Sequence, residues 1–251
     1  MKKVALVTGA SAGLGVEFAR LLAKRGHPLV LVARRRDRLE ALAMELGNAR
    51  AVTIDLSKAN AVGKLMADIE AAGEQVGLLV NNAGFGLIGK VADLEAKRLR
   101  QMIDLNVGAL TDLCRAVAPQ MIARQSGAIL NVASTAAFQP GPKMAVYFAT
   151  KAYVLSFTEA LHEELKPHGV KVSCLCPGPT RTEFGEVAGF GGNGLFDRTA
   201  MDPPQVVEFG LAALDKNHAV AVPGWMNKVT AASTRFAPRP VVRKIAGAIK
   251  Y

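Results

Sequence analysis

The sequence predicts an α/β protein of one domain, built on a doubly wound parallel sheet of about seven strands with helices on both faces. Short β-branched runs alternate with helix-length segments from the first residues onward. These runs are apolar almost throughout, as expected for strands that are covered on both faces. A glycine-rich turn follows the first run, and in such sheets ligands bind beyond the carboxyl ends of the strands.

Seven runs are expected to form strands because they are short, apolar and bounded by turn residues. They are residues 4–8, 29–33, 51–55, 78–82, 128–134, 170–176 and 219–223. Between them, apolar residues recur at steps of three and four, as in Leu39, Leu42 and Leu46 before Gly47, which predicts helices. Each strand, helix and strand in succession then forms a crossover between parallel strands.

The length and composition fit a single core. The chain has 251 residues, half of them apolar, and no long linker, low-complexity segment or internal repeat divides it. Its cysteines, at 114, 174 and 176, form no CxxC pair and are expected to be free thiols in a reducing compartment. The apolar run at the start is too short for a secretory signal, and no run is long enough to span a bilayer, so we expect a cytoplasmic protein.

The positive charge is concentrated near the end of the chain. The net charge is +10, of which six charges lie in residues 225–251, where no acidic residue occurs. The remaining +4 is ordinary for a protein surface, and no nucleic-acid recognition module accompanies the charge, so we expect no nucleic-acid partner.

The first strand ends in TGASAGLG, residues 8–15, and a helical pattern follows. Glycines at 9, 13 and 15 let the backbone turn tightly and approach a phosphate, and the free N–H groups at the start of a helix favour an anion. A strand before the turn and a helix after it favour a dinucleotide site over a simple turn. The spacing, however, is G-x-x-x-G-x-G and not G-x-G-x-x-G.

The residues after the second strand bear on cofactor choice. A site for NAD(H) usually has Asp or Glu about 20 residues beyond the glycine turn, whereas Arg there accommodates a 2′-phosphate. This chain has Ala33 followed by three arginines, 34 to 36. We therefore expect NADP(H), with Arg34 as the main phosphate ligand and Arg35 as a helper. The alternative is a solvated basic run ahead of a helix.

The stretch AVYFATKAY, residues 145–153, holds a candidate proton donor. Tyr147 and Lys151 are four apart and share one face of a helix, whereas Tyr153 points elsewhere. At about 5 Å and an effective dielectric of about 20, a cation favours a phenolate by roughly 3 kcal/mol, which would lower the pKa of Tyr147 by about two. Tyr147 could then act as a general acid or base. By spacing alone, such a pair is more often a surface pair.

Several motifs in order resemble the short-chain dehydrogenases/reductases, in the compact branch of about 250 residues. They are TGASAGLG (8–15), NNAG (81–84), LNVGA (105–109), Ser134 placed thirteen residues before YFATK (147–151), and PGPTRT (177–182). The resemblance covers residues 4–224 and implies a Rossmann-type fold, a nicotinamide cofactor and a homodimer or homotetramer.

The resemblance implies a role for each matching residue. Ser134 would bind the substrate oxygen, Tyr147 would exchange the proton, and Lys151 would bind the nicotinamide ribose and tune the tyrosine. Asn106 resembles the asparagine that helps hold a water in the proton path, although alone it could be a local hydrogen-bonding residue. The implied cofactor ligands are Gly9, Ser11, Gly13, Leu14, Gly15, Asp55, Asn82, Ala83, Gly84, Pro177, Gly178, Thr180 and Thr182.

Some details of the pattern limit what is implied. Positions 11 and 12 carry no basic residue, so the NADP(H) preference depends on the arginines after the second strand. Asp55, expected to receive the adenine amino group, could instead be a helix-entry residue. The four histidines are scattered without ligand spacing, and we expect no metal.

Residues 179–204 form a glycine-rich stretch that also holds Phe184, Phe190 and Phe196. A loop of this length is usually functional or mobile, and we expect it to be a lid over an apolar pocket. Further candidates to line that pocket are Phe85, Leu87, Ile88 and Phe138. For each phenylalanine, ordinary core packing is the alternative.

Residues 225–251 form a basic extension beyond the resemblance. Pro240 opens VVRKIAGAIKY, in which Val241, Val242 and Ile245 share a helical face. Docking on the domain or a sister subunit is the first expectation. Contact with an anionic membrane surface or an acidic carrier protein is the alternative.

Together these features predict an NADP(H)-dependent oxidoreductase acting on an apolar ketone, an aldehyde or the corresponding secondary alcohol. One rival is a 3-oxoacyl-carrier-protein reductase, suggested only by the basic extension. The other is a protein that senses NADP(H) on the same fold without turnover.

Overall fold

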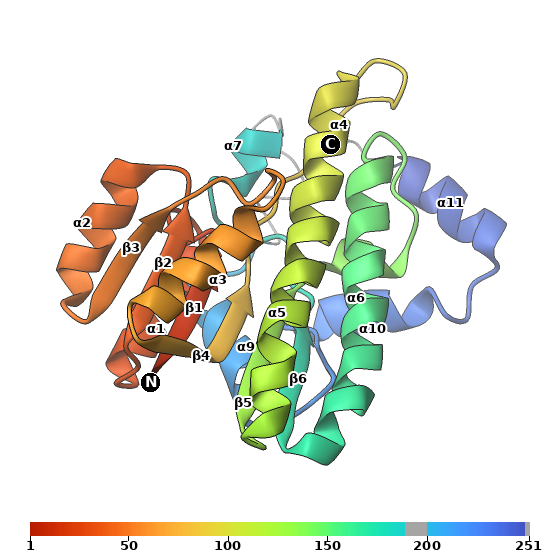
Figure 1. Ribbon diagram of the computed structural model, residues 1–251. Helices are drawn as coiled ribbons and strands as arrows, with labels where there is room; N and C mark the ends of the chain where they lie inside the picture. Colours follow the sequence, from red (N-terminus) through yellow and green to blue (C-terminus); the bar gives the residue numbers. More distant parts are fainter. Residues whose placement is uncertain (189–199, 249–251) are drawn as a thin grey trace.

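The computed structural model describes residues 1–188 and 200–248, and it contains the expected parallel sheet (Figure 1). Seven strands pair in the order β3-β2-β1-β4-β5-β6-β7, every pair parallel. The fold class predicted from the sequence is therefore confirmed. The strands are β1 (Lys2–Thr8), β2 (Leu29–Ala33), β3 (Ala49–Thr53), β4 (Glu74–Asn81), β5 (Gly127–Val132), β6 (Val170–Leu175) and β7 (Val220–Ala221).

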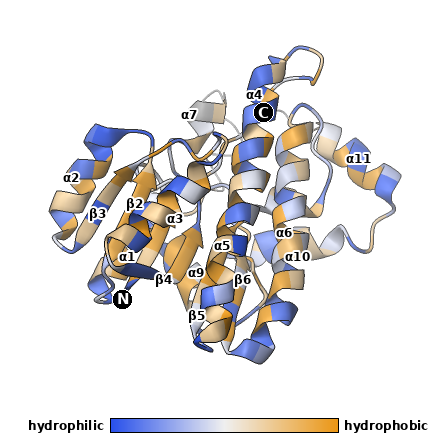
Figure 2. Cartoon of the chain, in the orientation of Figure 1, coloured by the Kyte–Doolittle hydropathy of each residue, from blue (hydrophilic) through white to orange (hydrophobic). Residues whose placement is uncertain are grey.

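Helices cover both faces of the sheet because successive strand residues point to opposite sides. On one face, α3 (Ala61–Ala71), α5 (Leu110–Ala123) and α6 (Ala145–Leu165) pack against residues such as Leu6 and Ile129. On the other face, α1 (Leu14–Lys24), α2 (Arg36–Leu46) and α9 (Pro203–Asp215) pack against Val7 and Leu130. Figure 2 shows largely apolar strands between helices that carry both hydrophilic and hydrophobic segments.

The remaining described elements lie mainly in connections and in the C-terminal extension. They are α4 (Ala96–Ile103), the π-helix η1 (Asp104–Ala109), the 3-10 helices η2 (Thr135–Phe138) and η3 (Lys166–His168), α7 (Phe184–Ala188), α10 (Trp225–Ser233) and α11 (Arg239–Ala248). Of the expected lid, residues 189–199, with Phe190 and Phe196, lie outside the described residues.

Several strand boundaries differ from the expectation. The fifth strand ends at Val132 and not at 134, because Ser134 begins the 3-10 helix η2 as its N-cap. The last strand has two residues where five were expected. The third lies two residues earlier, over Ala49–Thr53. Apolar character marks these runs correctly, but hydrogen bonding sets their ends.

The strand order places a crevice above β1 and β4. From β1 the chain moves outward through β2 and β3 and then returns to the other side of β1 as β4. The loops after β1 and β4 therefore diverge at the carboxyl edge of the sheet, where ligands bind in such folds.

All three cysteines are free, as expected, and they are buried. In the described part of the chain, no helix is long and apolar enough to cross a bilayer.

Candidate active site

A cleft of about 910 Å³ opens at this carboxyl edge. It gathers most residues that the sequence singled out, although they come from separate loops. Of the predicted residues that the structure describes, Gly15, Leu87, Ile88 and Asn106 are not in its lining. The predicted residues that line it are Gly9, Ser11, Gly13, Leu14, Arg34, Arg35, Asp55, Asn82, Ala83, Gly84, Phe85, Ser134, Phe138, Tyr147, Lys151, Pro177, Gly178, Thr180, Thr182 and Phe184.

The glycine turn needs its glycines for two different reasons. Gly9 and Gly13 have φ values of +68° and +53°, a region that other residues rarely adopt. Gly15 begins the first turn of α1, and a Cβ there would lie 2.1 Å from the carbonyl oxygen of Gly9. The turn can therefore close tightly only if position 15 has no side chain.

Asn82 holds this turn against the loop after β4. Its Nδ2 donates to the carbonyl oxygen of Thr8 at 3.0 Å. The Thr8 hydroxyl oxygen accepts from the backbone N–H groups of Asn82 and Ala83, both at 3.0 Å. The NNAG motif thus has a structural role of its own, in addition to lining the cleft.

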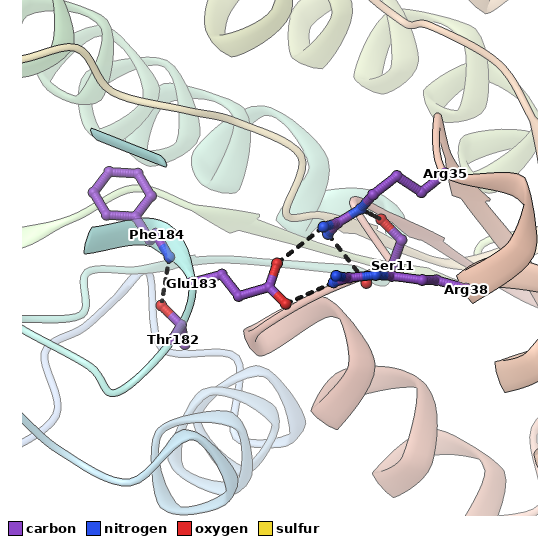
Figure 3. A network of polar contacts seen from close by, with 6 residues as sticks. All are labelled: Ser11, Arg35, Arg38, Thr182, Glu183 and Phe184. Carbon is purple, nitrogen blue, oxygen red and sulfur yellow. Dashed lines mark hydrogen bonds and ion pairs between the residues drawn. The ribbon is translucent and has the colours of Figure 1, made fainter. Parts of the chain in front are cut away.

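The arginines after β2 are arranged differently from the expectation (Figure 3). Arg34, expected to be the main ligand, is exposed and lines the cleft. Arg35 is the arginine fixed to the glycine turn, with Nε and Nη2 each 3.2 Å from Ser11 atoms. Its Nη1 donates to Glu183 at 2.9 Å, and Arg38 donates to the same carboxylate at 2.6 Å. Arg38 and Glu183 were missed by the sequence reasoning.

Tyr147 and Lys151 lie on one face of α6, as the four-residue spacing predicts. The Lys151 Nζ atom is 5.8 Å from the centre of the Tyr147 ring and donates to the carbonyl oxygen of Val132 at 2.8 Å. Both side chains are more than nine-tenths buried, so the alternative of a solvated surface pair is wrong.

The expected lowering of the pKa of Tyr147 is absent from this structure. Burial raises the pKa of Tyr147 to about 12, and the neighbouring Ser134 hydroxyl only partly opposes this rise. Burial also lowers the pKa of Lys151 to about 8. The spacing of Tyr147 and Lys151 predicts the nearby cation but not the burial, and in a buried site desolvation of the phenolate outweighs the effect of the cation. Tyr147 is accordingly protonated at neutral pH, as a proton donor must be.

Ser134 is positioned by the short helix η2. As its N-cap, the Ser134 Oγ accepts a hydrogen bond from the backbone N–H of Ala136 at 3.1 Å. This bond uses the hydroxyl as an acceptor and leaves its proton available to a cleft ligand or to Tyr147. The capping role and the predicted functional role are therefore compatible.

Asn106 lies in the π-helix η1 and is 1% exposed. Its Oδ1 accepts from the backbone N–H of Phe85, and its Nδ2 donates to the Phe85 carbonyl at 2.9 Å and to Thr150 Oγ1 at 3.1 Å. A Cβ on Gly84 would lie 3.1 Å from Asn106 Oδ1 and 3.5 Å from Lys151 Nζ. Asn106 thus fixes the loop after β4 from behind the cleft.

Asp55 serves locally and also faces the cleft. Its Oδ1 accepts from both the backbone N–H and the hydroxyl of Ser57, at 3.0 and 2.7 Å, so it fixes the turn that leads into α3, whose N-cap is Asn60. The loop after β6 is also locally bonded. The Thr180 hydroxyl donates to the Gly178 carbonyl at 3.0 Å, and Thr182 Oγ1 accepts from the backbone N–H of Phe184 at 3.3 Å.

An apolar wall surrounds the tyrosine. The Phe184 ring lies 5.4 Å from the Tyr147 ring, and Phe85 belongs to the same cluster. Phe138 lines the cleft but also packs on the main core. Leu87 and Ile88 pack against this cluster but are not in the cleft lining, so their contact with a substrate stays a prediction.

The C-terminal extension contributes a wall of the cleft that the sequence reasoning missed. Asn227, Thr230, Ala231 and Thr234, from α10 and the turn that follows it, line the cleft. Asn227 packs so closely on the loop after β6 that a Cβ on Gly178 would lie 2.5 Å from its amide. Their spacing of three and four residues was the signal that could have identified this helix face.

Among the described residues, no three His, Cys, Asp or Glu side chains form a group that could hold a metal ion.

Comparison with known proteins adds the family. Residues 3–189 match the family model described as short chain dehydrogenase. A short-chain dehydrogenase from Sphingobium yanoikuyae, solved in complex with NADPH, is 32% identical and superposes with a TM-score of 0.83, covering 100% of this chain and 97% of that one.

Two further solved structures are similar. A bulky-bulky ketone specific alcohol dehydrogenase from Comamonas testosteroni is 28% identical with a TM-score of 0.79, covering 100% of this chain and 95% of that one. A 3-ketoacyl-(acyl-carrier-protein) reductase from Brucella melitensis, complexed with NADH, is 32% identical with a TM-score of 0.77, covering 88% and 94%.

Proposed function

Because this chain belongs to the short-chain dehydrogenase/reductase family, we propose that it is an NADP(H)-dependent oxidoreductase that reduces an apolar ketone or aldehyde, or oxidises the corresponding secondary alcohol. The observation that carries this proposal is the meeting of Ser134, Tyr147 and Lys151 in the cleft that begins at the glycine turn. Ser134 comes from the start of η2, and Tyr147 and Lys151 come from α6, so it is the fold that brings the serine to the other two.

The cleft fits a nicotinamide dinucleotide. Its glycine turn exposes backbone at the start of α1, where an anionic pyrophosphate is favoured. Asn82, Ala83 and Gly84 would bring backbone against the adenosine half, and Pro177, Gly178, Thr180 and Thr182 would border the nicotinamide half; all of them line the cleft. When bound, the nicotinamide supplies or accepts the hydride.

The protein's own contribution is to orient the substrate and transfer a proton. Ser134 donates a hydrogen bond to the carbonyl oxygen and holds it near the Tyr147 hydroxyl. Tyr147, protonated because burial raises its pKa, donates its proton to that oxygen as the carbonyl is reduced. Such general acid catalysis contributes about 10² to 10⁴ in rate.

Lys151 acts as the cation of the site. Its pKa of about 8 keeps the ammonium charged at neutral pH, and its hydrogen bond to Val132 fixes its direction. We propose that it binds the nicotinamide ribose and stabilises the phenolate left after proton transfer. Asn106 is proposed as a positioning residue, since its three hydrogen bonds hold the backbone of Phe85 and Thr150.

The preference for NADP(H) is supported by the basic residues at the adenosine end. Arg34 and Arg35 both line the cleft, and the end of β2 carries no acidic residue that would select a free 2′-hydroxyl. The fold alone does not decide between cofactors, because one similar structure contains NADPH and another NADH.

An apolar substrate is supported by the wall of Phe85, Phe138 and Phe184 around Tyr147. One of the similar proteins is a bulky-bulky ketone specific alcohol dehydrogenase.

A second candidate is reduction of a 3-oxoacyl group on a carrier protein. It is favoured by the basic extension, which borders the cleft through α10. Comparing a carrier-bound 3-oxoacyl substrate with a free ketone of equal chain length separates the two.

The experiment that tests the proposal is a screen of apolar ketones and alcohols with NADPH, NADH and their oxidised forms. We expect ketone-dependent oxidation of NADPH, faster than that of NADH. Absence of turnover with both cofactors would contradict it.

We also propose a cellular compartment and an assembly for the protein. Three free, buried cysteines favour a reducing compartment such as the cytoplasm. A homodimer or homotetramer is the expected assembly, which sedimentation or light scattering would test.

A further inference from the structure

Glu183 joins two arginines at the adenosine end of the cleft (Figure 3). Its Oε2 accepts from Arg35 Nη1 at 2.9 Å and its Oε1 from Arg38 Nη1 at 2.6 Å. The carboxylate comes from the loop after β6, about 145 residues away from the arginines along the chain. The contact therefore exists only in the folded protein.

Glu183 binds the same arginine that lines the cleft and is expected to meet a 2′-phosphate on the adenosine ribose. The Nε and Nη2 atoms of Arg35 donate to Ser11 and its Nη1 donates to Glu183, so three of the five guanidinium N–H groups are used and one on each Nη atom is left. A carboxylate and a phosphate bind guanidinium groups through the same planar donor arrangement. A phosphate that binds Arg35 must therefore either share the guanidinium with the Glu183 carboxylate, against the repulsion of the two anions, or displace that carboxylate.

The charge of the site depends on this one carboxylate. With Glu183 paired, one negative charge offsets two positive charges from Arg35 and Arg38. Hydrogen bonds from Arg35, the larger effect, and from Arg38 hold the pKa of Glu183 below its ordinary value. The carboxylate is therefore ionised at neutral pH. A phosphate carrying about −1.5 to −2 charges would be repelled by it.

We propose that Glu183 is an internal competitor of the cofactor's 2′-phosphate and thereby sets the selectivity between NADP(H) and NAD(H), with Arg38 as a further phosphate ligand. This inference rests on the proposed function. Both ion pairs are about half exposed, and such pairs are weak individually. Release of two of them corresponds to about a 3- to 30-fold change in affinity.

The test measures binding and not turnover. Isothermal titration calorimetry with NADPH, NADH, adenosine 2′,5′-bisphosphate and 5′-AMP compares the wild type with Glu183→Gln. The matched control is Glu40→Gln, because Glu40 pairs with Arg36 on the exposed side of α2. We expect Glu183→Gln to bind NADPH and the bisphosphate about 3- to 30-fold more tightly. The affinities of Glu183→Gln for NADH and 5′-AMP should stay within about twofold of the wild-type values. The affinities of Glu40→Gln for all four ligands should do the same.

A second variant tests Arg38. Arg38→Gln should weaken NADPH and the bisphosphate but not NADH, whereas Arg36→Gln should change none of them. The inference is overturned if the wild type binds NADPH but Glu183→Gln leaves the NADPH to NADH ratio unchanged or lowers it. The proposed function fails separately, if the wild type binds neither dinucleotide or turns over no ketone.

Discussion

Replacing the buried lysine should stabilise the protein while abolishing catalysis. Lys151 is 6% exposed, and burial lowers its pKa from 10.5 to about 8. A lowered lysine pKa means that folding disfavours the charged form. The variant Lys151→Met keeps a long side chain of similar volume and removes the charge, so it relieves this penalty.

The magnitude follows from the pKa values. One pKa unit corresponds to about 1.4 kcal/mol, so the ammonium destabilises the folded state by about 3 kcal/mol at pH 7. The variant also deprives the Val132 carbonyl of its hydrogen bond from Lys151, which costs about 1 kcal/mol. The net gain at neutral pH is about 2 kcal/mol, or about 4 to 8 °C in Tm for a domain of this size.

The pH dependence identifies the cause. The penalty is complete below the folded pKa of about 8 and disappears as the pH rises toward the unfolded value of 10.5, because the folded state then loses its proton first. Between about pH 6.5 and about pH 9.5, wild-type stability should therefore rise by about 2 kcal/mol relative to the variant. The stability gain of Lys151→Met should shrink to about zero.

Urea denaturation without cofactor at these two pH values measures both quantities. Lys64→Met, at an exposed position on α3, is the control. Its stability should differ from that of the wild type by the same small amount at both pH values. A stability difference between wild type and Lys151→Met that does not change with pH would refute the reasoning. So would a variant that is less stable than the wild type at the lower pH.

Two further predictions concern the cofactor turn and the support of the cleft. Gly15→Ala places a Cβ 2.1 Å from the Gly9 carbonyl, so NADPH affinity should fall at least tenfold (about 1.4 kcal/mol). The control is Gly63→Ala in α3, where an added Cβ would have no atom within 4 Å, and it should bind NADPH as the wild type does. If a fluorescence titration gives Gly15→Ala the same NADPH affinity as the wild type, the expectation is contradicted. Asn106→Leu leaves the Phe85 N–H and C=O without their partner and should destabilise the fold by about 2 to 5 kcal/mol. Urea denaturation checks this, and a loss below about 0.5 kcal/mol would show that these bonds are readily replaced.

Local sequence patterns predicted much of the fold. Apolar runs located every strand, since burial on both faces requires them. The four-residue spacing placed Tyr147 and Lys151 together, because helix geometry is the same in every protein. The glycine spacing likewise identified the turn at the end of β1.

The rest depends on contacts between distant segments. Glu183 reaches Arg38 across 145 residues, and no local pattern records that contact. The same holds for Asn227, which contacts the loop after β6 although the sequence resemblance ends before its helix. The pKa of Tyr147 was predicted in the wrong direction because the extent of its burial is a property of the completed fold.

The central claim, that Tyr147 donates the proton in carbonyl reduction, is tested most directly with Tyr147→Phe. This change removes one hydroxyl from a ring that remains packed on Phe184. NADPH binding, followed by fluorescence, should stay within about twofold, while kcat/KM for an apolar ketone should fall by about 10² to 10⁴. A variant that binds NADPH and consumes it with the ketone at the wild-type rate would contradict the account and would leave a cofactor-binding fold whose chemistry lies elsewhere.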